Sequence, residues 1–195
     1  MSQQNTQNAT PQQARTVETV DRGKLDLKAL TLYAILLAAG FVLNMTVSKF
    51  FSGMTGGILS PEFIIAAFCL EVLIIKPNVG QAAVLGLLAG VVIQITASVK
   101  GPDLIAEPVA AVIMALLVSA LGKSAGAKKV LPLVGTFVVT CISGFVYAII
   151  FACFVQRNPA LIGVMAPAIV MTGVFNAIIV QALFIPVKKA LKLND

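Results

Sequence analysis

The sequence predicts an all-α integral membrane protein, built as a single bundle of six transmembrane helices with cytoplasmic N- and C-termini. Hydrophobic residues make up 58% of the 195 residues and charged residues only 11%, which is too apolar for a soluble domain. A helix that crosses a bilayer needs about 20 mostly apolar residues. Polar and Gly/Pro-containing segments divide the chain into six such runs, at residues 29–50, 60–76, 80–98, 107–122, 130–154 and 166–187.

The Lys and Arg residues indicate the orientation of this bundle, because cytoplasmic loops of membrane proteins retain positive charge. A cytoplasmic N-terminus places eleven of the fourteen basic residues inside and leaves only Lys49, Lys100 and Arg157 outside. Both termini are therefore expected in the cytoplasm. The same bias accounts for the net charge of +6, so no nucleic-acid partner is expected.

The chain is expected to have two parts. Residues 1–25 are rich in Gln, Asn and Thr and precede the first apolar run, so they are predicted to be a disordered cytoplasmic tail rather than a signal peptide. Residues 26–195 form the transmembrane domain. The chain has no His, few acids and three Cys that all lie in apolar runs, so we expect neither an enzyme nor a metal or cofactor site.

Polar side chains within the apolar runs gather in one half of the predicted membrane. Asn44, Gln94 and Tyr147 fall in the outer halves of helices that run outward, and Asn176 lies near the middle of the last helix. Such residues in lipid bind ligands or bridge helices. Each one alone fits both roles about equally, but together they indicate a substrate pocket at the outer face.

Acidic residues in the outer connections complete this candidate site. Glu62 follows Ser60 and Pro61, which suit a helix cap and a first helical position, so a structural role is slightly favoured for it. Asp103 and Glu107 are expected in a loop over the pocket, because a residue before proline is disfavoured in a helix. Glu107 is the preferred ligand contact, with Glu62 and Asp103 as further candidates.

Glu71 is the one acid well inside an apolar run. It lies nine residues after Glu62, which would place the two side chains on opposite faces of one helix. A structural or partner-binding role for Glu71 comes first, and transfer of a proton in a coupled transporter is the alternative.

Small residues at four-residue spacing mark faces where helices approach closely. Ala82, Gly86 and Gly90 on the third predicted helix are interpreted as internal packing. Ala34 and Ala38 on the first helix form a similar face. They follow Lys28 in the sequence Ala34-Ile-Leu-Leu-Ala38.

This last pattern resembles the Ala-xxx-Ala motif of the substrate-binding S components of energy-coupling factor (ECF) transporters. These are small bacterial plasma-membrane proteins with six helices and cytoplasmic ends. By that resemblance, Ala34 and Ala38 would dock to a coupling membrane subunit. The middle of the chain resembles the tryptophan-transporter type, through Gly56-Gly57, Ser60-Pro61-Glu62, Gly101-Pro102-Asp103 and Glu107-Pro108-Val109. Glu71 and the long polar tail depart from the family pattern.

The resemblance implies a multi-pass subunit that binds a small metabolite at the outer face, with tryptophan as the first candidate and a vitamin or its precursor as the next. Uptake would depend on a coupling membrane subunit, two cytoplasmic ATPases and surrounding membrane lipid. Gly122-Lys123-Ser124 is not a nucleotide loop, because position 117 is Leu rather than the Gly that the motif requires. The alternative is a self-sufficient secondary transporter, with Glu71 or Glu107 coupling proton movement to substrate entry.

Overall fold

The computed structural model describes residues 23, 25–122 and 124–191, and every regular element in them is helical. The first continuous helical segment consists of α1 (Leu27–Leu43), the π-helix η1 (Asn44–Ser48) and α2 (Lys49–Met54). The following elements are α3 (Phe63–Ile75), α4 (Val79–Gln94), α5 (Asp103–Leu121), α6 (Ala125–Ile149), the π-helix η2 (Ile150–Val155) and α7 (Leu161–Ala190). The predicted tail of residues 1–25 lies almost wholly outside the described residues.

Within the described residues, four helical segments are long and apolar enough to cross a membrane: Leu27–Met54, Asp103–Leu121, Gly126–Val155 and Leu161–Ala190. This all-helical architecture agrees with the predicted class of membrane-embedded helical protein. α3 and α4 are also apolar but contain only 13 and 16 residues. At about 1.5 Å per residue they are roughly 20–24 Å long, which is shorter than the hydrocarbon core of about 30 Å.

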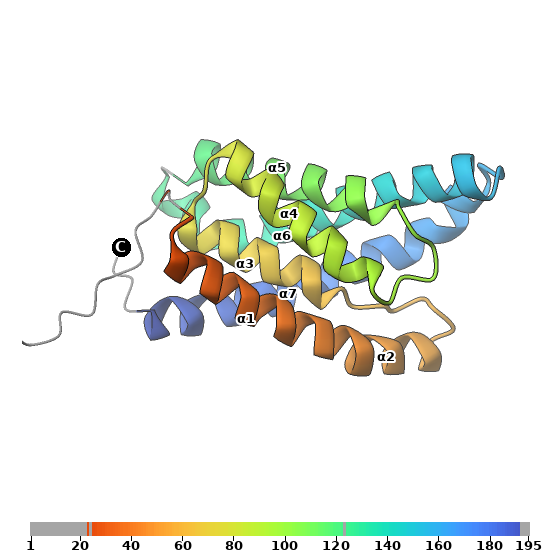
Figure 1. The fold of residues 1–195 in the computed structure, drawn as a ribbon, viewed down its shortest axis with the longest axis horizontal. Helices are drawn as coiled ribbons and strands as arrows, with labels where there is room; N and C mark the ends of the chain where they lie inside the picture. Colours follow the sequence, from red (N-terminus) through yellow and green to blue (C-terminus); the bar gives the residue numbers. More distant parts are fainter. Residues whose placement is uncertain (1–22, 24, 123, 192–195) are drawn as a thin grey trace, which may run out of the picture.

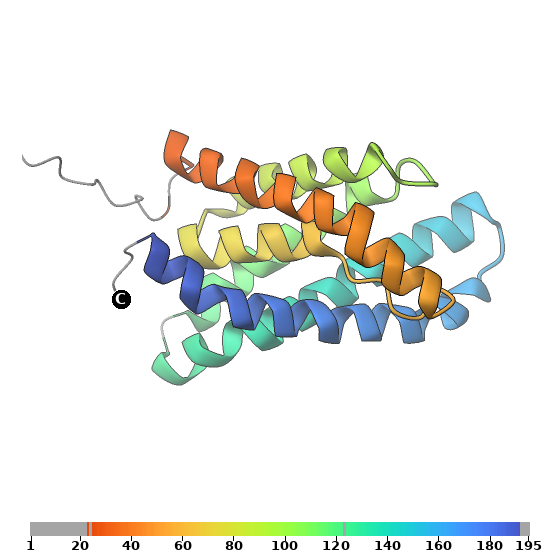
Figure 2. The ribbon, with the colours of Figure 1, turned by 90° about the horizontal axis from the view of Figure 1, so that it is seen from below.

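α3 is the central helix of the bundle (Figures 1 and 2). All of its 13 residues are buried, and it contacts α1, α4, α5, α6 and α7. A helix that is apolar on every face is stable only where neighbours or lipid surround it. Because α3 is short and central, the non-helical segment before it, residues 55–62, has to reach into the bundle.

α4 packs directly on the backbone of α5 through two glycines. A Cβ atom added to Gly86 would lie 2.5 Å from the carbonyl oxygen of Glu107, and one added to Gly90 would lie 2.7 Å from that of Asp103. Ala82 is fully buried on the same side of α4. These contacts confirm that the small-residue face of α4 serves internal packing.

The expectation that Glu107 belongs to a loop is wrong. α5 begins at Asp103, and Glu107 and Pro108 both lie inside it. Proline disfavours a helical conformation of the preceding residue but does not forbid it, and close packing on α4 holds this segment helical. The cost is one backbone hydrogen bond near the start of α5, because proline has no N–H.

α7 also begins earlier than predicted, at Leu161 rather than near residue 166, and it contains Pro167. Helices in membrane proteins tolerate proline where neighbouring groups satisfy the freed backbone. The tight connection Gln156–Ala160 therefore joins η2 to a longer final helix.

The beginning of α1 and the end of α7 lie at the same end of the bundle (Figures 1 and 2). We call this the lysine end, because the described residues Lys28, Lys76, Lys128, Lys129, Lys188 and Lys189 belong to helix termini located there. The opposite end contains the connections α2–α3, α4–α5 and η2–α7, with Lys49, Lys100 and Arg157. The basic residues thus separate along the bundle axis as the charge pattern predicts.

Candidate functional site

Asn44 holds the beginning of α3 from a different helix. It lies where α1 passes into η1, and its Oδ1 accepts a hydrogen bond from the backbone N–H of Phe63 at 2.7 Å. Its Nδ2 donates to Oε2 of Glu62 at 2.8 Å. The expectation that Ser60 caps this helix is therefore wrong, because Asn44 supplies the cap and the Oγ of Ser60 lies 3.3 Å from that of Ser48.

Asn176 holds the same segment from α7. Its side chain is fully buried, and its Oδ1 accepts from the Glu62 N–H while its Nδ2 donates to the Glu62 carbonyl, both at 3.1 Å. The Nδ2 also lies 3.5 Å from Oγ1 of Thr140. One turn earlier on α7, Thr172 donates to the carbonyl of Ser60 at 2.9 Å. Asn44 and Asn176 thus act as helix bridges that meet at Glu62.

Glu107 is buried between α5 and α6, and only 2% of its surface is exposed. Its Oε1 accepts a hydrogen bond from Ser143 at 2.9 Å, whereas its Oε2 has no partner among the described residues. An unpaired buried carboxyl oxygen is costly. This atom is the strongest indication of a missing hydrogen-bonding group in this half of the bundle.

Asp103 and Gln94 organise the α4–α5 connection. Gln94 Nε2 donates to Oδ2 of Asp103 at 3.4 Å, and Gln94 Oε1 accepts from the backbone N–H of Gly101 at 2.9 Å. Gly101 has a φ of +110°, a conformation that favours glycine. The Lys100 ammonium also contacts the carbonyl of Gln94. Gln94 therefore has a clear role in fixing this turn.

Three carboxyl groups lie in this half of the bundle. Asp103 and Glu107 are four residues apart on one face of α5, and Glu62 directly precedes α3, which packs on α5. Tyr147 on α6 lies within electrostatic range of Asp103 and Glu62. The hydrogen-bond partners of the three carboxyl groups are Asn44, Gln94 and Ser143, none of which is cationic. Such an arrangement favours a ligand that carries a positive charge or several N–H and O–H donors.

A cavity of about 390 Å³ opens beside this network, between the η1 region and the end of α4. We call it the polar cavity. Of the predicted site residues, Asn44 and Glu62 line it, whereas Gln94, Asp103, Glu107, Tyr147 and Asn176 do not. Its remaining lining residues are Met45, Ser48, Lys49, Ser52, Ser60, Ile93, Thr96 and Ala97.

Sequence reasoning missed several polar residues of this region. Ser48 and Ser52 follow Asn44 at four-residue spacing, which places them on one helical face and could have identified them as a group. Thr140 and Ser143 lie three residues apart on α6 and bond to Asn176 and Glu107 respectively. Small hydroxyl side chains are common at helix interfaces, so the sequence alone does not separate these from packing residues.

The aromatic residues near this end pack mainly on one another. Phe51 and Phe63 both contact Phe175, with ring centroids 6.1 and 6.2 Å apart, and Tyr147 stacks on Phe151 at 6.0 Å. Phe50 is exposed, and neither it, Phe51 nor Tyr147 lines the polar cavity. The rings thus contribute to helix packing at this end.

Glu71 is fully buried in α3, and neither of its carboxyl oxygens has a hydrogen-bond partner among the described residues. Its surroundings in α3 are apolar. A carboxyl group in this position is strongly disfavoured in its charged form. The burial of Glu71 separates its carboxyl group from any aqueous surface of the bundle.

Ala34 and Ala38 both lie exposed on α1, whereas Tyr33 and Leu37 form its buried face. Tyr33 donates a hydrogen bond to the carbonyl of Leu85 on α4 at 2.6 Å. The close-approach face of Ala34 and Ala38 therefore points away from the bundle and does not serve packing within it.

Comparisons with protein-family models, curated proteins and solved structures each found no significant match. Functional inference for this chain therefore depends on its own residues.

Proposed function

We propose that this protein is the substrate-binding membrane subunit of an ECF-type importer, with six transmembrane helices, cytoplasmic ends and α3 and α4 counted among the crossings. It would bind a small metabolite in the half of the bundle opposite the lysine end. The location of the beginning of α1 and the end of α7 at the lysine end supports an even number of crossings. In this orientation the lysine end faces the cytoplasm of a bacterial cell.

The observation that carries this proposal is the buried Glu107, whose Oε2 has no hydrogen-bond partner among the described residues, in the same half of the bundle as Glu62 and Asp103. A ligand ammonium or N–H group near this atom would satisfy a carboxyl oxygen that the protein leaves unpaired. Asn44 and Asn176 would hold Glu62 in place beside the ligand. An amino acid such as tryptophan, or a vitamin precursor with amino groups, fits this chemistry.

In this proposal the chain itself hydrolyses no ATP. A coupling membrane subunit would dock on the exposed face formed by Ala34 and Ala38, and two cytoplasmic ATPases would supply the energy. Small residues on an exposed helix face permit close approach of a partner helix. Their exposure supports docking over internal packing for this face.

The test is calorimetric binding of L-tryptophan to the purified full chain, in parallel with Glu107→Gln. The substitution keeps an acceptor for Ser143 but removes the negative charge. We expect at least a tenfold loss of affinity, or about 1.4 kcal/mol, with unchanged thermal unfolding. Glu18→Gln, a loss of charge far from the network in sequence, is the control. If tryptophan does not bind and a different metabolite copurifies with the protein, that metabolite is the substrate. If the Glu107 variant binds the metabolite as tightly as the parent protein does, the Glu107 carboxyl group is not part of the binding site.

A second candidate is a proton-coupled secondary transporter, which the buried Glu71 favours, since its carboxyl group has no hydrogen-bond partner in the described part of the chain. A carboxyl group that is neutral in apolar surroundings and charged when hydrated is a plausible proton carrier in membrane transport. Proteoliposomes that contain only this chain discriminate between the candidates. Substrate uptake driven by a pH gradient, and lost in Glu71→Gln, would establish the second function; no uptake without ATPase partners supports the first.

A further inference from the structure

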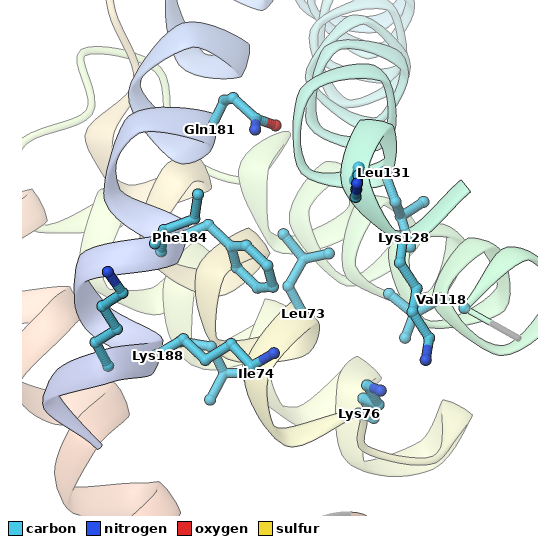
Figure 3. A pocket seen from close by; sticks show the side chains of 13 residues that line it. Leu73, Ile74, Lys76, Val118, Lys128, Leu131, Gln181, Phe184 and Lys188 are labelled. Carbon is cyan, nitrogen blue, oxygen red and sulfur yellow. The ribbon is translucent and has the colours of Figure 1, made fainter. Parts of the chain in front are cut away.

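A second cavity lies at the lysine end, far along the bundle from the polar cavity. It has a volume of about 590 Å³ and is bounded by α3, α5, α6 and α7. We call it the lysine pocket. Figure 3 shows Gln181 and Phe184 of α7 on one side, Lys128 and Leu131 of α6 on the other, and Leu73 of α3 between them.

The charge of the lysine pocket is strongly one-sided. Five lysines line it, Lys76, Lys128, Lys129, Lys188 and Lys189, and none of the described lining residues is acidic. They come from three different helices, so the tertiary fold gathers charges that are distant in sequence. Like charges around one concave surface raise its local potential and attract anions.

The interior of the pocket is apolar. Leu73, Ile74, Val118 and Leu131 are buried residues that form its walls, together with the partly buried ring of Phe184. Lys188 lies seven residues after Gln181 on α7, which corresponds to roughly 10 Å along the helix. The pocket thus combines cationic groups near the helix ends with an apolar section of about that depth.

Gln181 provides a polar group farther into the pocket. Its Oε1 is buried and has no hydrogen-bond partner among the described residues. A buried amide oxygen without a partner is unfavourable. A ligand or its accompanying water that reaches this depth would complete the site.

We propose that the lysine pocket binds the phosphate group of an anionic phospholipid, with the first part of an acyl chain against the apolar walls. Lysine ammonium groups bind phosphate as compact point charges. Basic pockets between membrane helices hold anionic lipid head groups in this way. The proposal concerns a different site from metabolite binding and does not depend on transport.

A soluble organic phosphate shares the anionic chemistry, but the structure favours a lipid. The pocket lies among the ends of long apolar helices, where head groups meet water. A small hydrophilic phosphate bound among the lysines would leave the apolar walls of the pocket uncovered by any apolar group of the ligand. A lipid covers that surface with hydrocarbon and places its phosphate among the lysines at the same time.

The experiment measures binding of dioleoyl phosphatidylglycerol to the full chain in neutral detergent by native mass spectrometry. Dioleoyl phosphatidylcholine is the lipid with the same chains and no net charge, and glycerol 3-phosphate is the soluble phosphate. We expect phosphatidylglycerol to bind at least tenfold more tightly than either. Lys128→Gln combined with Lys189→Gln, on opposite helices, should weaken it at least fivefold.

The matched control is Lys49→Gln combined with Arg157→Gln, which removes the same charge at the opposite end and should change affinity less than twofold. Lys128→Arg combined with Lys189→Arg should retain binding, because the positive charge is kept. Equal affinity for phosphatidylcholine, equal affinity for glycerol 3-phosphate, or the same loss in the control variant would each overturn the proposal. Tight phosphatidylglycerol binding that is insensitive to the Lys128 and Lys189 changes would overturn it as well.

Discussion

At the scale of single residues, the buried side-chain amide of Asn176 forms hydrogen bonds with the backbone just before α3. It satisfies both the N–H and the carbonyl of Glu62, which lies just before α3 and outside any helix. The first turn of α3 supplies a second partner for the Glu62 carbonyl, the N–H of Ala66, whereas the Glu62 N–H precedes the helix and depends on Asn176. The polar network therefore has a structural function of its own, because it holds the beginning of α3.

We predict that Asn176→Ala destabilises the protein by roughly 1–3 kcal/mol, because it removes the hydrogen-bond partner of the Glu62 N–H and leaves the Glu62 carbonyl only the N–H of Ala66. Thermal unfolding of the purified protein in detergent measures the change. Gln156→Ala, which removes an exposed amide at the same end of the bundle, should leave the unfolding midpoint unchanged. An Asn176 variant as stable as the parent would show that water or a rearranged loop satisfies Glu62.

At the scale of elements, the α4–α5 pair depends on glycines that permit contact between a helix and a helix backbone. Gly86 is the tightest of these, because an added Cβ atom would lie 2.5 Å from the Glu107 carbonyl oxygen and 2.6 Å from the Cα of Pro108. The obstacle is main chain, so the two helices would have to separate. This pair also places Glu107, so its geometry matters for the polar network.

Gly86→Ala is therefore expected to destabilise the bundle by roughly 1–3 kcal/mol through overpacking, despite the higher helix propensity of alanine. Gly126→Ala on α6 is the matched control, since nothing lies within 4 Å of the added methyl group there. Chemical or thermal unfolding of both variants is the measurement. Equal stability of the two would contradict close packing of α4 on α5.

The exposed face of α1 gives a second prediction for a single element. Ala34→Leu combined with Ala38→Leu should leave folding and metabolite affinity nearly unchanged, because both positions are exposed in the bundle. It should abolish copurification of a coupling subunit and ATP-driven uptake, since bulky residues prevent close helix approach. Ala120→Leu, an exposed position on α5, is the control. Retained transport in the double variant would argue against docking at this face.

At the scale of the whole molecule, the two ends of the bundle differ in chemistry. The lysine end holds the basic pocket, and the opposite half holds the three carboxyl groups. A bilayer with a negative inner surface favours the orientation that places the lysine end inside. In that orientation the polar network would face outward, as the proposed uptake of a metabolite requires.

This orientation predicts the result of cysteine labelling in intact cells, using a chain whose native Cys69, Cys141 and Cys153 are replaced by Ala. A membrane-impermeant maleimide should label Gln156→Cys at the opposite end but not Ser124→Cys at the lysine end. Permeabilised cells supply the control, in which both positions react. If only Ser124→Cys is labelled in intact cells, the lysine end faces outward and the topology is the reverse of the one predicted here.

The sequence determined the helical membrane class, the separation of basic residues between two ends and the packing role of Gly86 and Gly90. These features follow from composition and periodicity, because the solvent preference of each segment depends mainly on its own residues. The sequence also selected Asn44, Glu62, Glu107 and Asn176 as members of one region. It did not reveal that the two amides bridge helices, since hydrogen-bond partners far apart in the chain leave no local pattern.

Only the tertiary structure decided that Glu107 lies inside a helix, that Asn44 caps α3 from α1 and that lysines of three helices share one pocket. Each of these features depends on which helices are neighbours and on their relative positions along the bundle axis. Packing against α4 outweighed the local preference of the residue before Pro108, and the short length of α3 required polar groups from other helices at its beginning. Local sequence sets the preferences of a segment, whereas contacts between distant segments decide which preference is realised.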